Sequence, residues 1–266
     1  MSLLAAKLIL TPLLIAAATL AVRRWGFVVG GWFAGLPLTS GPVSVFLALE
    51  QGPAFAAQAA HGTLLGLIAM AAFCVAYARS AKNWSWPICL TFAFGAYLAT
   101  TLGLAGIPSS LVVSTLLSVL LVSVAIRAVG VPVSRPSRII APWWDLPVRM
   151  ATATAMVLLI TGGAEYLGPR WSGMLSPFPV FACIMALFSQ TQDGAMAAQR
   201  VLRGVIIGSY GAASFLVVVG FAVERASLVF VYFLATSIAV AVNGISLVTL
   251  IRRPGANERV STTPDT

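Results

Sequence analysis

The chain has 266 residues, of which 59% are hydrophobic and only 9% are charged, and its formal net charge is +9. A water-soluble domain carries charge on about a quarter of its residues, so this composition excludes that class. Apolar runs of about 20 residues, each long enough to cross a hydrocarbon core of ~30 Å, recur along the chain. The sequence therefore predicts an all-α, polytopic membrane protein.

Nine apolar segments are predicted to be transmembrane helices. In chain order they cover residues 3–22, 26–50, 54–78, 84–104, 107–129, 146–164, 171–191, 196–222 and 226–251. The first segment has features of a signal peptide, but it leads directly into further membrane sequence, and we expect it to be retained. Gly and Pro in GLAGIP, residues 103–108, predict a tight turn, whereas 131–147 is the one substantial loop.

The basic residues predict the orientation of these spans. With the N-terminus in the periplasm, 13 of the 16 Lys and Arg residues fall on the cytoplasmic side. The three on the other side are Lys7, Arg170 and Arg225. This distribution predicts a multi-pass membrane protein with a periplasmic N-terminus and a cytoplasmic C-terminus. Because the charges mark span ends and form no basic face, we expect no nucleic acid partner.

Catalytic and metal-binding patterns are absent from the sequence. Its three cysteines, Cys74, Cys89 and Cys183, lie inside apolar runs and lack the spacing of a metal site or a disulfide framework. The chain has one histidine, no phosphate-binding Gly-rich loop with a lysine, and no aspartate pair suited to Mg²⁺ and diphosphate. We therefore expect no enzymatic activity and no cofactor or metal.

An internal repeat emerges when the chain is compared with itself at an offset of 142 residues. Residues 26–66 then align with 168–208, and all five glycines of the second window meet glycines of the first. Pro37 meets Pro179 and His61 meets Arg203 in the same frame. The first four spans thus match the last four, while the fifth is a connector.

This repeat predicts the domain organisation. Corresponding spans are five crossings apart, an odd number, so the two copies should lie upside down relative to each other, as in many secondary transporters. The expected division is a first repeat at 1–106, a connector helix and cytoplasmic loop at 107–145, a second repeat at 146–253 and a disordered tail at 254–266.

Each repeat contains one span interrupted by prolines. The interruptions are GLPLTSGP at 35–42 and SPFPV at 176–180. Proline removes a backbone donor, and freed carbonyls are costly in lipid unless protein, water or a ligand satisfies them. Paired breaks therefore point to a central binding site, and the alternative is a pair of kinks that only shape packing. The candidate substrate-binding residues at these breaks are Pro37, Thr39, Ser40, Gly41, Ser44, Ser176, Pro177 and Pro179.

Further polar residues follow each broken span. Glu50 ends the first broken span and His61 follows it, while Asp193 ends the second and Arg203 follows it. Glu50, His61 and Asp193 are candidates for proton coupling, because a histidine changes charge near neutral pH. Gln190 and Arg203 are candidates for substrate binding, with Arg203 suited to an anionic group or to neutralising Asp193. The alternative is that these are interface charges that fix loops and topology.

The segment WSGMLSPFPVFACIMALFSQTQDGAMAAQRVLRGVIIGS, residues 171–209, resembles the GlpM-type small bacterial inner-membrane proteins. The resemblance runs through Pro177, Pro179, Phe181, Gly194, Arg203 and Gly208. It implies a location in the bacterial inner membrane and a four-span unit with a link to exopolysaccharide (alginate) production. This chain departs from the family by carrying two such units and a connector.

The sequence thus supports two functions. The first is a small secondary permease or proton-coupled exporter for a small polar or anionic solute that binds at the two broken helices. The matched basic pairs, Lys7 with Arg149 and His61 with Arg203, favour an anion. The alternative is a non-transporting membrane subunit that supports envelope polysaccharide synthesis. The expected partners are the lipid bilayer, a small-molecule solute and a second copy in a homodimer.

Overall fold

The computed structural model describes residues 40–106, 110–130 and 143–251, together with Pro37 and a few isolated positions before residue 21. Every regular element in these residues is a helix, which confirms the all-α prediction. Most of the predicted span 3–22, most of the first half of span 26–50, the loop 131–142 and the tail from residue 252 lie outside the described residues.

The described chain forms nine helices. They are α2 (Ser40–Glu50), α3 (Pro53–Ser80), α4 (Trp86–Ala105), α5 (Leu111–Val129), α6 (Asp145–Gly162), α7 (Ala164–Leu175), α8 (Val180–Asp193), α9 (Ala195–Ala222) and α10 (Leu228–Ile251). Five of them, α3, α4, α5, α9 and α10, are long and apolar enough to cross a membrane. The nine helices are not the nine predicted spans, because span 171–191 divides into α7 and α8 and span 3–22 is not described.

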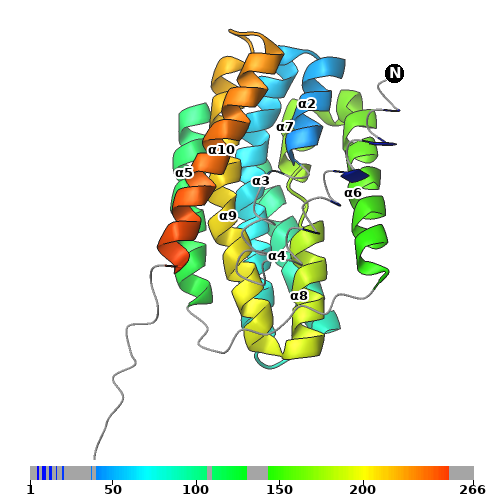
Figure 1. Ribbon diagram of the computed structural model, residues 1–266, viewed down its shortest axis with the longest axis vertical. Coiled ribbons are helices and arrows are strands. Elements are labelled where there is room, and N and C mark those ends of the chain that lie inside the picture. Colours follow the sequence, from blue (N-terminus) through cyan, green and yellow to red (C-terminus); the bar gives the residue numbers. More distant parts are fainter. Residues whose placement is uncertain are drawn as a thin grey trace, which may run out of the picture.

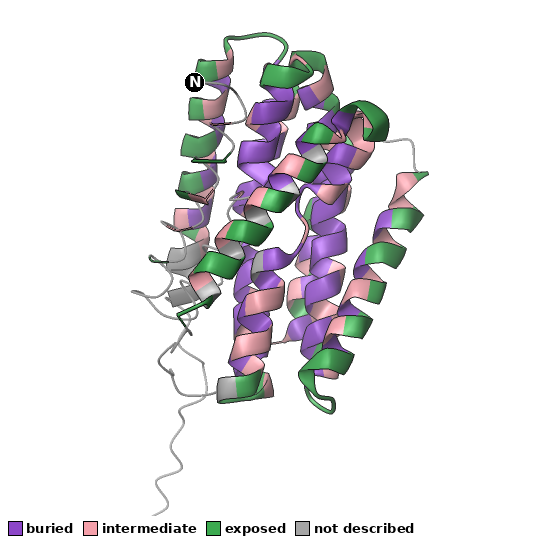
Figure 2. Cartoon of the chain, turned by 90° about the vertical axis from the view of Figure 1, so that its right-hand side faces the viewer, coloured by how far each residue is buried: buried purple, intermediate pink, exposed green. Residues whose placement is uncertain are grey.

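Two long helices form the centre of the bundle. α3 and α9 have 28 residues each and pack against one another. α4 and α7 pack on α3, α10 packs on α9, and α5 contacts both central helices. Figure 2 shows the central helices buried along much of their length, whereas the outer helices are buried mainly on one face. The hydrophobic surface turned outward is the surface expected to meet lipid.

Local signals explain where these helices begin and end. Proline occupies the first turn of α3 and of α4, where its missing N–H costs no helical hydrogen bond. The Ser110 hydroxyl caps α5 by accepting the N–H of Val113 at 3.3 Å. α7 is kinked at Gly168, which has φ 72° and is followed by Pro169. The sequence also predicted a turn at residues 103–108, and α4 ends at Ala105 while α5 begins at Leu111.

The helix boundaries repeat at the offset found in the sequence. α3 begins at Pro53 and α9 begins 142 residues later at Ala195, and the two helices have equal length. Each is preceded by a glycine in nearly the same strained conformation, Gly52 with φ 92° and Gly194 with φ 83°. Residues other than glycine rarely adopt such angles, which explains why both repeats carry glycine here. Figure 1 shows that α3 and α9 run in opposite directions, as do α2 and α8 and also α4 and α10.

A glycine contact joins α3 to α7. A Cβ added at Gly62 would collide with the carbonyl oxygen of Arg170, and one added at Gly173 would collide with that of Ala59. At Gly66 it would lie 2.6 Å from Cγ of Pro177. The absence of side chains at these three positions allows the backbones to approach closely, as small residues do between membrane helices.

Candidate functional site

Two short helices, α2 and α8, begin inside the bundle. With 11 and 14 residues they are too short to cross the ~30 Å hydrocarbon core, which requires about 20 residues. Figure 1 shows that they start in the middle of the molecule and run toward opposite ends. A single helix, α6, packs against both α2 and α8.

The first turns of α2 and α8 are built in the same way. The N–H of Gly41 donates to the carbonyl of Pro37 at 2.7 Å, and that of Cys183 donates to the carbonyl of Pro179 at 2.8 Å. These two hydrogen bonds are equivalent under the 142-residue offset. The matched prolines therefore occupy matched places at the starts of the two short helices.

The break before α8 is closed by tight turns. Between Leu175 and Val180 the backbone N–H groups of Ser176, Phe178 and Val180 find carbonyl partners at 2.8–3.1 Å. Pro177 and Pro179 are buried here, and the Phe178 ring stacks on Phe94 with centroids 5.7 Å apart. The break is thus packed against α4 rather than exposed to lipid.

Two hydroxyls near this break have no hydrogen-bond partner among the residues that the structure describes. Ser172 and Ser176 are 0% and 1% exposed, and neither Oγ atom is satisfied. They are four residues apart at the end of α7, so they lie on one face of that helix. A buried hydroxyl without a partner costs free energy, which makes these two groups available to a polar ligand or to water.

The start of α2 is tied to α10. Ser40, Gly41 and Ser44 are buried. The Tyr232 hydroxyl donates to the Ser44 carbonyl at 2.8 Å, and the Ser44 hydroxyl lies 2.9 Å from the same tyrosine oxygen. Since the tyrosine proton is used on the carbonyl, the serine hydroxyl is the donor in the second bond. This pair links residues 188 positions apart and joins the first repeat to the second.

The end of α8 is tied to α3 in a comparable way. Gln190 accepts the hydroxyl proton of Tyr77 at 2.8 Å and donates its amide to the carbonyl of Trp84 at 2.9 Å. Both ends of the Gln190 side chain are therefore engaged within the protein. Sequence reasoning missed Tyr77 and Tyr232, although a tyrosine inside an apolar span signals that its hydroxyl requires a partner.

Arg203 does not lie beside the breaks. Its guanidinium donates to the carbonyl of Ile126 at 3.0 Å and also to that of Gly130, at the end of α5. A cation is favourable at the C-terminal end of a helix, where carbonyls are unsatisfied. Arg170 makes a similar bond of 2.9 Å to Leu104 at the end of α4. The structure therefore gives Arg203 an anchoring contact that the sequence did not predict.

The candidate proton-coupling residues lie at the ends of the bundle. Glu50 and Asp193 are the exposed last residues of α2 and α8. The carboxylate whose charge acts on the half-buried His61 is Glu224, which follows α9. The His61 ring also lies beside Gly220 of α9. Thr39, Lys7 and the side chain of Arg149 lie outside the described residues.

The described residues contain no group of three or more His, Cys, Asp and Glu side chains that could hold a metal ion. Cys74 and Cys89 are buried and Cys183 is half-buried, and all three are free thiols.

Comparisons with protein-family models, curated proteins and solved structures gave no match. The architecture alone therefore defines the class, an all-α protein with several helices able to cross a membrane. The resemblance to GlpM-type proteins stays a prediction.

Proposed function

We propose that the protein is a small secondary permease that binds a small polar or anionic solute between the starts of α2 and α8. The observation that carries this proposal is the pair of short helices that begin inside the bundle, in repeats that run in opposite directions. Inverted repeats with discontinuous helices place substrate near the middle of the membrane in known transporters. The N-terminal end of a helix carries partial positive charge, which favours an anion.

The free hydroxyls near α8 support the same site. Ser172 and Ser176 are buried and have no partner in the described part of the chain, and a solute with hydrogen-bonding groups would satisfy them. The exporter is proposed to be coupled to protons through His61, with Glu50 and Asp193 at the two ends of the path. Glu224, whose charge acts on His61, then belongs to the same group.

The proposed location is the bacterial inner membrane, with the N-terminus in the periplasm and the C-terminus in the cytoplasm. The last turns of α3 and α5 and the first turns of α9 lie at one end of the bundle and carry Arg79, Arg127 and Arg203. Arg225 lies in the turn after α9 at the other end. Basic residues favour the cytoplasmic side, which supports this orientation.

Transport is tested with purified protein in liposomes on a solid-supported membrane. The probes are phosphate, sugar phosphates and mono- and dicarboxylates, each with and without a proton gradient. Metabolite profiles of a deletion strain guide the choice of further probes. We expect a current with at least one anion, and we expect it to fall in Ser176→Ala, which removes a hydroxyl that has no partner within the described ranges. Ser209→Ala is the matched control, because its buried hydroxyl bonds to Val205 of its own helix.

A second candidate is a non-transporting membrane subunit that supports envelope polysaccharide synthesis. It is favoured by the internal hydrogen bonds of Ser44 and Gln190, because polar groups that are satisfied within the protein have no need of a solute. Absence of current with every probe, together with an unchanged metabolite profile, would refute the permease and leave this candidate.

A further inference from the structure

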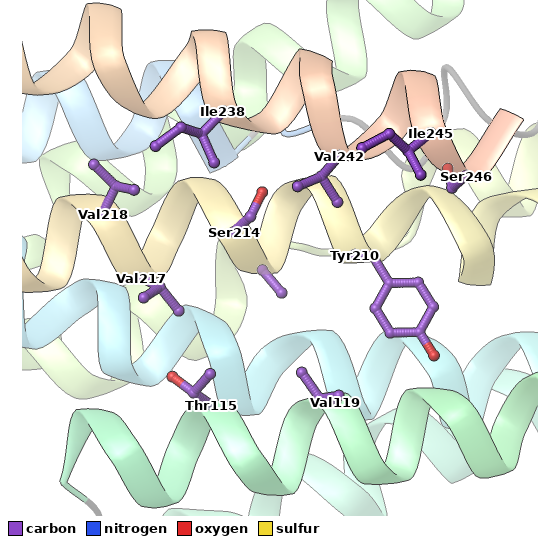
Figure 3. Close-up of a pocket in the computed structure, with 11 residues that line it drawn as sticks. Thr115, Val119, Tyr210, Ser214, Val217, Val218, Ile238, Val242, Ile245 and Ser246 are labelled. Atoms are coloured by element: carbon purple, nitrogen blue, oxygen red, sulfur yellow. The ribbon is translucent and has the colours of Figure 1, made fainter. Parts of the chain in front are cut away.

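An apolar groove of about 530 Å³ runs along the outside of the bundle. Figure 3 shows α9 as its floor, with α5 on one side and α10 on the other. Its volume falls within the roughly 300–1,000 Å³ of sites that hold small molecules. All three of its helices are long and apolar enough to cross a membrane, so the groove faces the bilayer.

The groove lies where small residues of α9 face the space between α5 and α10. On the side of α5 toward α4, large side chains such as Leu117 and Leu121 pack with Leu65 and Ile68 of α3. On the side toward α10, the floor contributed by α9 includes the small residues Ala213 and Ser214. Small residues on the floor leave the space between the two walls unfilled.

The polar groups that line the groove are already satisfied. The hydroxyls of Thr115, Ser214 and Ser246 bond to carbonyls of their own helices at 2.7–2.8 Å. The Tyr210 hydroxyl bonds to Ser123 at 2.6 Å. The remaining lining residues are valine, isoleucine and alanine. A polar ligand would therefore gain no hydrogen bond here, whereas a hydrocarbon chain would gain contact with apolar side chains.

Positive charge lies at one end of this groove. Arg127 is exposed in the last turn of α5, one helical turn beyond Ser123, and residues four apart lie on the same face of a helix. The Arg203 guanidinium lies at the same end of α5, on the carbonyls of Ile126 and Gly130. Basic residues at the edge of the membrane attract anionic headgroups.

We propose that this groove binds one acyl chain of an anionic phospholipid, with the phosphate of its headgroup beside Arg127. Because the lining hydroxyls are already satisfied, the groove favours a hydrocarbon chain. The positive charge of Arg127 favours a negatively charged headgroup. This site is separate from the starts of α2 and α8 and does not depend on transport.

The test is native mass spectrometry of the full chain in detergent, with phosphatidylglycerol or phosphatidylcholine added. We expect the wild type to retain phosphatidylglycerol preferentially. Val242→Trp fills the groove and should lower the bound lipid at least about fivefold, whereas Val240→Trp on the exposed side of the same helix should not. Arg127→Gln should reduce the preference for phosphatidylglycerol about fivefold. Arg79→Gln, an exposed arginine at the same end of the bundle, should leave it unchanged.

Ser214→Leu fills the floor of the groove with a smaller side chain than tryptophan, and it replaces Val242→Trp in the test if that variant does not fold. Lipid binding by folded groove-filling variants at the wild-type level would overturn the proposal. An unchanged preference in Arg127→Gln would overturn the assignment of the headgroup. A wild-type dimer that becomes a monomer in Val242→Trp would overturn the proposal by identifying a second copy as the occupant.

Discussion

At the scale of single residues, the contact between α3 and α7 depends on glycines that leave no room for a side chain. In Gly66→Ala the new Cβ would lie 2.5 Å from the carbonyl oxygen of Met174 and 2.6 Å from Pro177. Pro177 lies in the break before α8, and Met174 lies in the last turn of α7, which leads into that break. We expect the substitution to reduce the stability of the protein in detergent by about 1–3 kcal/mol, the usual cost of overpacking, measured by thermal unfolding.

Gly95→Ala is the control for this prediction. Gly95 lies in α4, where nothing lies within 4 Å of an added Cβ. Alanine favours the helix by up to about 1 kcal/mol relative to glycine, so this variant should be unchanged or slightly more stable. Equal melting temperatures for the two variants would show that the α3–α7 contact has room for a methyl group at Gly66.

The Tyr77–Gln190 hydrogen bond gives a second prediction at this scale. Tyr77→Phe removes the donor to Gln190, whose amide still bonds to Trp84. Hydrogen bonds between membrane helices contribute about 0.5–2 kcal/mol, and we expect a loss of that size in thermal unfolding. Tyr166→Phe changes a side chain that is 91% exposed and should have no effect. If both variants unfold alike, α8 is held to α3 by packing alone.

At the scale of helices, Arg203 is predicted to hold the end of α5. Arg203→Ala removes both bonds to the carbonyls of Ile126 and Gly130. Arg203→Lys keeps the charge, but a lysine ammonium lacks the fork that reaches two carbonyls in fixed geometry. Hydrogen exchange in the last turn of α5 should therefore be fastest in Arg203→Ala, intermediate in Arg203→Lys and slowest in the wild type. Arg79→Ala should leave the exchange of α5 unchanged. Loss of transport in Arg203→Ala with normal exchange in α5 would instead indicate a contact with solute.

The local features of the helices could be predicted from the sequence, and the contacts between distant helices could not. Glycine and proline constrain the backbone directly, so the prolines of SPFPV indicated the break between α7 and α8, whereas the places of Gly52 and Gly194 before α3 and α9 were not predicted. The bond between Ser44 and Tyr232 joins residues 188 positions apart, and no periodic pattern in the sequence indicates such a contact. The partners of Arg203 are backbone carbonyls, which no residue type reveals. The charge of Arg203 therefore indicated a polar contact but not what it touches.

At the scale of the whole molecule, the opposite directions of corresponding helices are the feature that most constrains function. The sequence repeat predicts two copies of one unit that lie upside down, and such copies would present similar surfaces to the two sides of a membrane. The short helices α2 and α8 then begin in the middle and end at opposite faces (Figure 1). The helix α5, which has no counterpart in the sequence repeat, forms one wall of the groove beside α10.

The inverted arrangement predicts on which side of the membrane the two matched turns lie. Gln51 and Asp193 are exposed, are equivalent under the 142-residue offset, and lie at the turns that follow α2 and α8. Cysteines are placed at each position in a chain whose three native cysteines are replaced by serine or alanine. A membrane-impermeant maleimide added to intact cells should label Gln51→Cys, because the basic residues predict that the cytoplasm is on the other side of the membrane from this turn. It should label Asp193→Cys only after the inner membrane is opened. Labelling of both from the outside would contradict the inverted repeat, and labelling of Asp193→Cys alone would reverse the orientation while leaving the repeat intact.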